Sequence, residues 1–185
     1  MVPRVAHFTV YADVSLSGLG AACEELQFLM QLHIPLCIQH RTLLHMSSAQ
    51  ARNNPLFVPI NDLELAAAIF SYAVAKCAIL SDPPSVPSRW PVLQLFSGNV
   101  SALAHLRKGT ARSHRSLSLL RIDCCLAKGA TLSMNSAHIA GVKKLLADAL
   151  SRNTTAFKLK PLIVLDLVLC SHTQMRGAKL FLPSQ

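Results

Sequence analysis

The order of the patterned segments constrains the fold of this chain more than any other feature of its sequence. Alternating apolar and β-branched residues from His7 to Tyr11 predict a strand. A predicted turn separates it from a second apolar run, Ala21 to Met30, and is formed by Ser15, Ser17, Gly18 and Gly20. Apolar residues then recur at helical spacing from Leu63 to Cys77, and a strand candidate follows at Trp90 to Phe96. Strands first, and then strands and helices in alternation, predict an α/β architecture with a mixed sheet.

The same patterns predict a central sheet of about five strands with helices at 61–80, 99–108, 113–128 and 142–151. The first three strands should be antiparallel, and residues 7–13 should lie beside residues 92–97. Asn61 and Asp62 are the expected cap of the first helix. Residues 33–59 contain several prolines and no clear periodicity, so we expect short strands and loops there.

Composition narrows the class of protein. Hydrophobic residues make up 51% of the chain and charged residues 15%, which excludes a disordered tail. The formal net charge of +9 favours polyanionic partners, nucleic acid first and an anionic membrane surface second. The apolar stretch at 162–169 is far shorter than the roughly 20 residues of a membrane span, and the N-terminus lacks a signal-peptide pattern. We therefore expect an intracellular protein, in the cytoplasm or nucleus, that is not secreted and does not enter a membrane.

Six cysteines are scattered along the chain without a C-x-x-C pair. In a chain without a secretion signal this pattern predicts reduced, mostly buried thiols, with Cys124 and Cys125 packed in the core. Clustered Cys and His at ligand spacing, which a structural zinc site requires, are not found.

Four short segments carry motifs. They are Val10-Tyr11-Ala12-Asp13-Val14-Ser15 with Gly18-x-Gly20-Ala21, then Pro59 to Leu65, then Leu95 to Ala102, and finally His138 to Val142 with Ala147-Asp148-Ala149-Leu150-Ser151-Arg152. In this order, over residues 7–152, the segments resemble the ribonuclease H domain of retrotransposon reverse transcriptases, of the DIRS-like or LTR type. The family patterns are approximately Y-T-D-A-S-x-x-G-x-G-A, I-N-x-L-E-L, T/S-D-N-x-x-A and H-I-P-G-x-x-N-x-x-A-D-x-L-S-R.

The resemblance implies a ribonuclease H-like fold over residues 1–152, followed by a C-terminal extension, 153–185, whose role is open. The extension is either an added strand on a sheet edge or a stretch that continues into another domain. The implied activity is hydrolysis of the RNA strand of RNA/DNA hybrids, and a reverse transcriptase domain is the implied neighbour in a parent polyprotein. Two Mg²⁺ ions about 4 Å apart, for which Mn²⁺ is a substitute, would activate a water and stabilise the leaving oxygen.

The resemblance also assigns the site residues. Asp13 would bridge both ions, and Glu64 and Asp148 would be the other carboxylate ligands. His138 would assist proton transfer or product release. The fourth ligand position holds Gly98 where the family has Asp, and the side chain of the adjacent Asn99 is expected to point to the other face of its strand. One missing carboxylate predicts impaired hydrolysis.

A basic stretch supplies the expected contact with nucleic acid. Between Ala104 and Lys144 stand eight of the 18 basic residues against one acid, Asp123. Lys and Arg side chains neutralise phosphates and release counterions. The candidate binding residues are Arg107, Lys108, Arg112, Arg115, Lys143 and Lys144.

Plainer interpretations stand beside these. Asp13 is also a common turn residue, Glu64 and Asp148 suit solvated helix positions, and His138 suits a strand end. A basic run is often only a solvated helix face. The alternative function is therefore a non-catalytic nucleic-acid-binding or interaction domain on the same fold. A small-molecule enzyme is a third hypothesis, but the sequence contains neither a phosphate loop nor a nucleophile motif for it.

Overall fold

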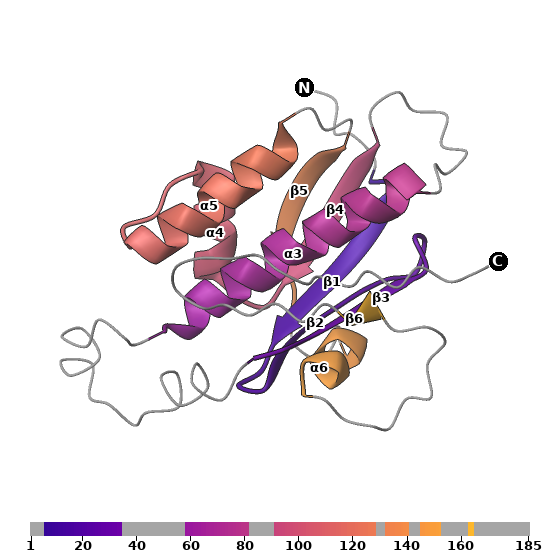
Figure 1. The fold of residues 1–185 in the computed structure, drawn as a ribbon, viewed down its shortest axis with the longest axis horizontal. Coiled ribbons are helices and arrows are strands. Elements are labelled where there is room, and N and C mark those ends of the chain that lie inside the picture. Colours follow the sequence, from indigo (N-terminus) through magenta and orange to yellow (C-terminus); the bar gives the residue numbers. More distant parts are fainter. Residues whose placement is uncertain are drawn as a thin grey trace.

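The computed structural model describes residues 6–34, 58–81, 91–128, 132–140, 145–152 and 163–164. Within these residues the chain forms one mixed sheet with helices on both faces (Figure 1). The strands are β1 (Phe8–Val14), β2 (Gly18–Cys23), β3 (Phe28–His33), β4 (Val92–Ser97), β5 (Ser133–His138) and β6 (Ile163–Val164). The helices are α3 (Ile60–Ser81), α4 (Val100–Lys108), α5 (His114–Ala127) and α6 (Leu145–Ser151). The predicted α/β class, with a mixed sheet flanked by helices, is confirmed.

The strand order is β5-β4-β1-β2-β3-β6. The pairs β1–β2 and β2–β3 are antiparallel, whereas β1–β4 and β4–β5 are parallel. The predicted antiparallel start of the sheet and the predicted contact between residues 7–13 and 92–97 are both confirmed. The apolar run at 21–30 is divided between β2 and β3, and the turn between these strands contains Gln27 with a positive φ of 50°.

The sheet extends by one short strand beyond β3. Ile163 and Val164 of β6 pair in parallel with Met30 and Gln31 of β3. This pairing corresponds to the first of the two roles considered for the C-terminal extension, the covering of a sheet edge. The rest of the extension lies outside the described residues, as do residues 35–57 of the region predicted to form short strands and loops, and residues 82–90.

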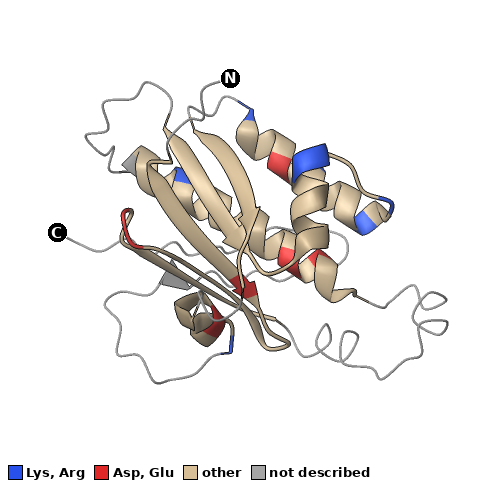
Figure 2. Cartoon of the chain, turned by 180° about the vertical axis from the view of Figure 1, so that it is seen from behind, with Lys and Arg blue, Asp and Glu red and all other residues tan. Residues whose placement is uncertain are grey.

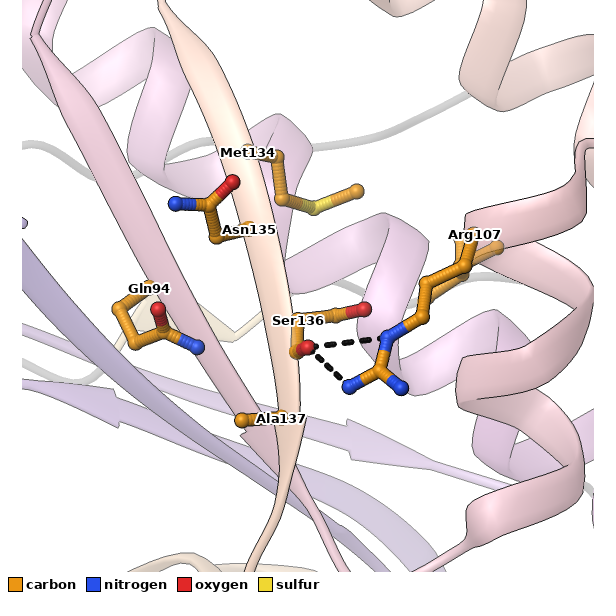
Figure 3. A pocket seen from close by; sticks show the side chains of 7 residues that line it. Gln94, Arg107, Met134, Asn135, Ser136 and Ala137 are labelled. Carbon is orange, nitrogen blue, oxygen red and sulfur yellow. Dashed lines mark hydrogen bonds between the residues drawn. The ribbon is translucent and has the colours of Figure 1, made fainter. Parts of the chain in front are cut away.

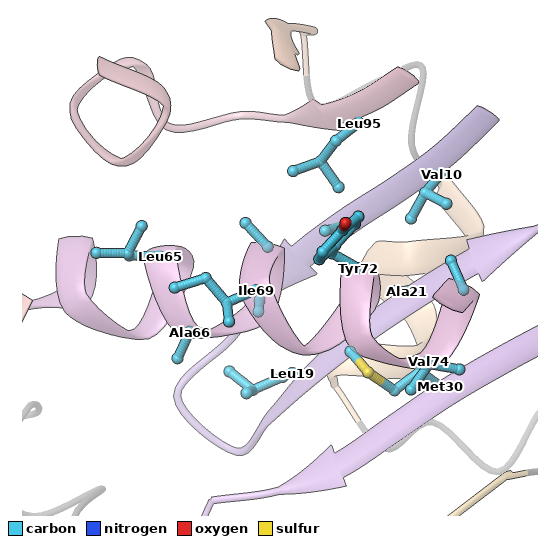
Figure 4. Close-up of a cluster of buried hydrophobic side chains, with 14 of the residues drawn as sticks. Val10, Leu19, Ala21, Met30, Leu65, Ala66, Ile69, Tyr72, Val74 and Leu95 are labelled. Atoms are coloured by element: carbon cyan, nitrogen blue, oxygen red, sulfur yellow. The ribbon is translucent and has the colours of Figure 1, made fainter. Parts of the chain in front are cut away.

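The core lies between the sheet and α3. Side chains that alternate along the strands, such as Val10, Leu19 and Met30, meet Ile69 and Tyr72 of α3 (Figure 4), and all five are at most 2% exposed. The Tyr72 hydroxyl donates a hydrogen bond to the Leu132 carbonyl, 3.1 Å away, just before β5. The long apolar helix is therefore fixed across the sheet by packing and by one satisfied polar group.

α3 is also, within the described part of the chain, the one helix long and apolar enough to cross a membrane. The span from Ile60 to Leu80 has a mean hydropathy of 1.7, and 67% of it is buried inside the protein. Core helices of globular proteins share this composition.

The cysteine expectation is partly wrong. Cys23 is buried, and burial raises the pKa of its thiol to about 12, which keeps it protonated. Cys77, Cys124 and Cys125 are exposed. The face of α5 that packs inward is the one with Ser116, Leu119 and Leu120, and Cys125 lies on the opposite side of the helix, whereas Cys124 lies at the margin of that face, one turn after Leu120.

Candidate functional site at the carboxyl ends of the parallel strands

Three parallel strands end side by side and bring several predicted site residues to one edge of the sheet. Ala12 of β1 is opposite Ser97 of β4, and Ser97 is opposite His138 of β5. Asp13 therefore stands one residue beyond the Ala12–Ser97 pair, and Gly98 directly follows Ser97. Asp13 is buried at 6% exposure, whereas His138 is exposed. Figure 2 shows acidic positions of β1, α3 and α6 around this end of the sheet.

Glu64 reaches this edge from the beginning of α3. The Ser97 hydroxyl donates a hydrogen bond to Glu64 Oε2 over 3.1 Å. Both residues are buried, Ser97 at 0% and Glu64 at 8% exposure. Since Ser97 pairs with Ala12, the carboxylate of Glu64 lies at the strand end next to which Asp13 stands. The structure thus brings Glu64 and the end of β1 to the same edge.

Asp148 approaches from α6 on the opposite face of the sheet. A Cβ atom on Gly20 of β2 would lie 2.3 Å from the Ala147 carbonyl oxygen and 2.5 Å from Ser151 N, so α6 rests directly on that glycine. Gly20 is opposite Asp13, and opposite residues of an antiparallel pair share one face. Asp13 and Asp148 therefore lie on the α6 side, whereas Glu64 comes from the α3 side.

Two further contacts fix α6. The Ser15 hydroxyl donates to the Ser151 carbonyl over 2.5 Å, and the Ser17 hydroxyl donates to the same oxygen over 3.3 Å. Asp148 accepts a hydrogen bond from Arg152 Nε at 2.9 Å, one helical turn later.

The two glycines of this region, Gly18 and Gly20, were expected to form a turn. Gly18 and Gly20 lie inside β2 instead, where the absence of a side chain permits the close approach of α6.

Gly98 has no side chain that could be a ligand, and the side chain of the next residue, Asn99, already makes two hydrogen bonds. Asn99 was expected to point to the other face of a strand, but it lies beyond the end of β4 and caps α4. Its Oδ1 accepts from Ala102 N at 2.9 Å, and its Nδ2 donates to Asn61 Oδ1 at 2.7 Å. Neither polar atom of the Asn99 side chain is available to replace a carboxylate at position 98.

Two of the predicted nucleic-acid-binding residues have internal partners. Arg107 donates through Nε and Nη2 to the Ser136 carbonyl of β5, at 3.2 and 2.5 Å (Figure 3). Arg115 Nη1 lies 3.7 Å from Asp62 Oδ2 in α3. Lys108 and Arg112 are exposed around the connection between α4 and α5. Lys143 and Lys144 lie outside the described residues.

An open pocket of about 590 Å³ lies between α4 and β5 beside Arg107. Gln94, Asn135 and Met134 also line it (Figure 3). The pocket is mixed in polarity, and none of the predicted catalytic residues lines it. It is therefore separate from the edge at which Asp13 stands.

Sequence reasoning missed the residues that hold the first turn of α3. Asn61 and Asp62 were expected to cap this helix, but it begins at Ile60, and both side chains bind neighbouring helices instead. Asp62 Oδ1 accepts from the Ser116 hydroxyl at 2.5 Å. Ser97 was quoted only as part of a motif. No local pattern marks its role, because its partner Glu64 lies 33 positions earlier in the sequence.

Asp123 is a partly buried acidic residue at the interface of α3 and α5. Burial raises the pKa of Asp123 above its ordinary value of 3.8, and within the described residues nothing donates to its Oδ1. Because the folded pKa exceeds the unfolded one, the stability penalty is absent below about pH 3.8 and grows as the pH rises through the folded pKa. We expect Asp123→Asn to raise the free energy of unfolding at pH 7. Urea unfolding at pH 7 and pH 3.5 should show a gain only at pH 7, and an equal gain at both would contradict this cause.

The donors at the edge have the right chemistry for magnesium, since carboxylates are hard oxygen ligands. Their number falls short: within the described ranges, no three His, Cys, Asp or Glu side chains form a group that would hold a metal ion. Comparison of the chain with protein families, curated proteins and solved structures gave no match.

Proposed function

We propose that this chain is the ribonuclease H-type domain of a retroelement polyprotein, which binds RNA/DNA hybrids and whose hydrolysis of the RNA strand is impaired by Gly98. One observation carries the proposal. Asp13 and Glu64, from different elements, reach the edge where the parallel strands β1 and β4 end, and α6 brings Asp148 to the face of Asp13. Gly98 follows β4 at that same edge, where one more carboxylate would belong.

The site has too few ligands for a metal ion among the described residues. Mg²⁺, when bound, supplies an activated water and stabilises the leaving oxygen. Asp13, Glu64 and Asp148 are of the required type, but the described donors do not complete a group of three. Asp13, which is buried, and Glu64, which is hydrogen-bonded, form an incomplete ligand set. The absence of a carboxylate at position 98 is one reason for this.

The alternative is a non-catalytic nucleic-acid-binding domain. The incomplete donor set favours it, and so does Asn99, whose side chain caps α4 and is thereby withdrawn from the site. The two functions share a binding surface and differ only at the metal site.

The binding surface is tested by charge. All four described candidates are exposed, but Arg107 and Arg115 also have partners within the protein, so Lys108 and Arg112 are chosen for the test. We expect the double variant Lys108→Glu and Arg112→Glu to weaken hybrid binding and to flatten the slope of log Kd against log salt by about 2, since each phosphate contact contributes about 0.9. Fluorescence anisotropy at several salt concentrations measures both quantities.

A matched control is Arg121→Glu with Lys128→Glu, which changes the net charge equally at one exposed position of α5 and one just after its end. The control should reduce affinity less and keep the steeper slope. Equal effects of the two pairs would assign binding to net charge rather than to the α4–α5 connection.

The reaction is tested with a labelled RNA/DNA hybrid in Mg²⁺ and in Mn²⁺, with duplex DNA and duplex RNA as controls. We expect the native chain to bind the hybrid and to cut its RNA strand slowly or not at all. Rapid cleavage by the native chain would contradict the effect assigned to Gly98. No preference for the hybrid over duplex DNA would contradict the proposed substrate.

A further inference from the structure

The first turn of α3 is held by three other elements. Asn61 accepts a hydrogen bond from Asn99 at the start of α4, and Asp62 accepts one from Ser116 of α5. Glu64 accepts one from Ser97 of β4. A helix terminus held at three points cannot rotate freely, so these contacts help to fix the position of Glu64.

The direction of the Ser97 hydrogen bond is determined by its surroundings. Ser97 Oγ accepts the backbone N–H of Asn99 at 3.2 Å, and it lies 3.1 Å from Glu64 Oε2. A hydroxyl has one hydrogen, and a carboxylate offers only acceptors, so that hydrogen is directed to Glu64. The backbone turn that starts α4 therefore orients the hydroxyl.

Burial strengthens this contact. Ser97 is fully buried, and Glu64 is 8% exposed. A hydrogen bond to a charged acceptor is stronger than one between neutral groups, and little water competes for it in a buried position. Without the hydroxyl, the carboxylate would lose a donor and gain rotamer freedom.

We propose that Ser97 is a positioning residue, which fixes the Glu64 carboxylate at the edge where β1 and β4 end. This inference rests on the proposed function for its consequence in catalysis, but the contact itself does not depend on activity. Ser97 would act on the reaction through the orientation of Glu64.

A double-mutant cycle tests the contact in the native chain. Ser97→Ala, Glu64→Ala and the double variant are compared by urea unfolding. We expect Ser97→Ala to lower the folding equilibrium constant about tenfold or more, as loss of a hydrogen bond to a charged group does, and to have a much smaller effect when Glu64 is already Ala. Ser97→Thr, which keeps the hydroxyl, should retain the coupling. Equal effects of Ser97→Ala in both backgrounds would overturn the proposal.

The catalytic consequence is tested in a Gly98→Asp background. There Ser97→Ala should lower the cleavage rate with hybrid Kd unchanged, and Ser97→Thr should restore the rate. A rate that is insensitive to Ser97→Ala would overturn the positioning role. If no Gly98→Asp protein cuts the hybrid, the proposed function fails, while coupling in the cycle still supports the contact between Ser97 and Glu64.

Discussion

Gly98→Asp should raise Mg²⁺-dependent cleavage of the RNA strand by about 10²–10³-fold over the native chain, the scale on which one electrostatic contact in a preorganised site acts. The new side chain follows Ser97 at the edge where Asp13 stands, so it returns a hard oxygen ligand and a negative charge. The backbone accepts it without left-handed strain, because Gly109 is the one described glycine with positive φ. The measurement is the single-turnover rate on a labelled hybrid.

Two control variants separate charge from shape. Gly98→Asn adds a side chain of the same size without the charge and should leave the rate near that of the native chain. Asp13→Asn in the Gly98→Asp background should abolish the gain. A Gly98→Asp protein that is folded, binds the hybrid and stays inactive would favour the non-catalytic binding domain.

Gly20→Ala should be the most destabilising single-methyl change in the described sheet. The added Cβ would lie 2.3 Å from the Ala147 carbonyl oxygen and 2.5 Å from Ser151 N, and these are backbone atoms that cannot rotate away. Overpacking costs about 1–3 kcal/mol when side chains can adjust, and we expect the upper end of that range or more here. Urea unfolding measures the loss. Because α6 carries Asp148, the displaced helix should also weaken any activity gained by Gly98→Asp.

The control for this steric effect is Gly109→Asn. A Cβ at position 109 meets nothing within 4 Å, and Asn tolerates the left-handed φ of 62°. It should change stability by less than about 1 kcal/mol. A Gly20→Ala protein as stable as this control would mean that α6 does not rest on β2 as described.

The fold was largely predictable because its signals are local and periodic. The apolar spacing in α3 and the alternation in β1 each reflect one buried face, and the predicted bounds of α3, α4 and α5 differ by at most one residue from those observed. The division of residues 21–30 into two strands was less visible, since its turn depends on Gln27 with a positive φ rather than on glycine or proline.

The carboxylates of the candidate site could be predicted from the sequence, but the residues that hold them in place could not. Asp13, Glu64 and Asp148 were chosen because their motifs resemble a known family. Ser97 and Gly20 matter through contacts with residues more than 30 positions away, which no local pattern reveals. Arg115 was assigned to nucleic acid because it lies in a basic stretch of the sequence. The sequence does not show that Asp62 lies within 4 Å of its guanidinium group.

The central claim is that Asp13, Glu64, Asp148 and position 98 belong to one metal site. A titration with Mn²⁺, in which the electron paramagnetic resonance signal of the free ion is monitored, tests this claim whether or not the protein cleaves RNA. The account predicts that Gly98→Asp binds Mn²⁺ at least about tenfold more tightly than the native chain, a difference of about 1.4 kcal/mol. It also predicts that Asp13→Asn removes this gain. Equal Mn²⁺ affinity in the native chain and in Gly98→Asp would contradict the claim.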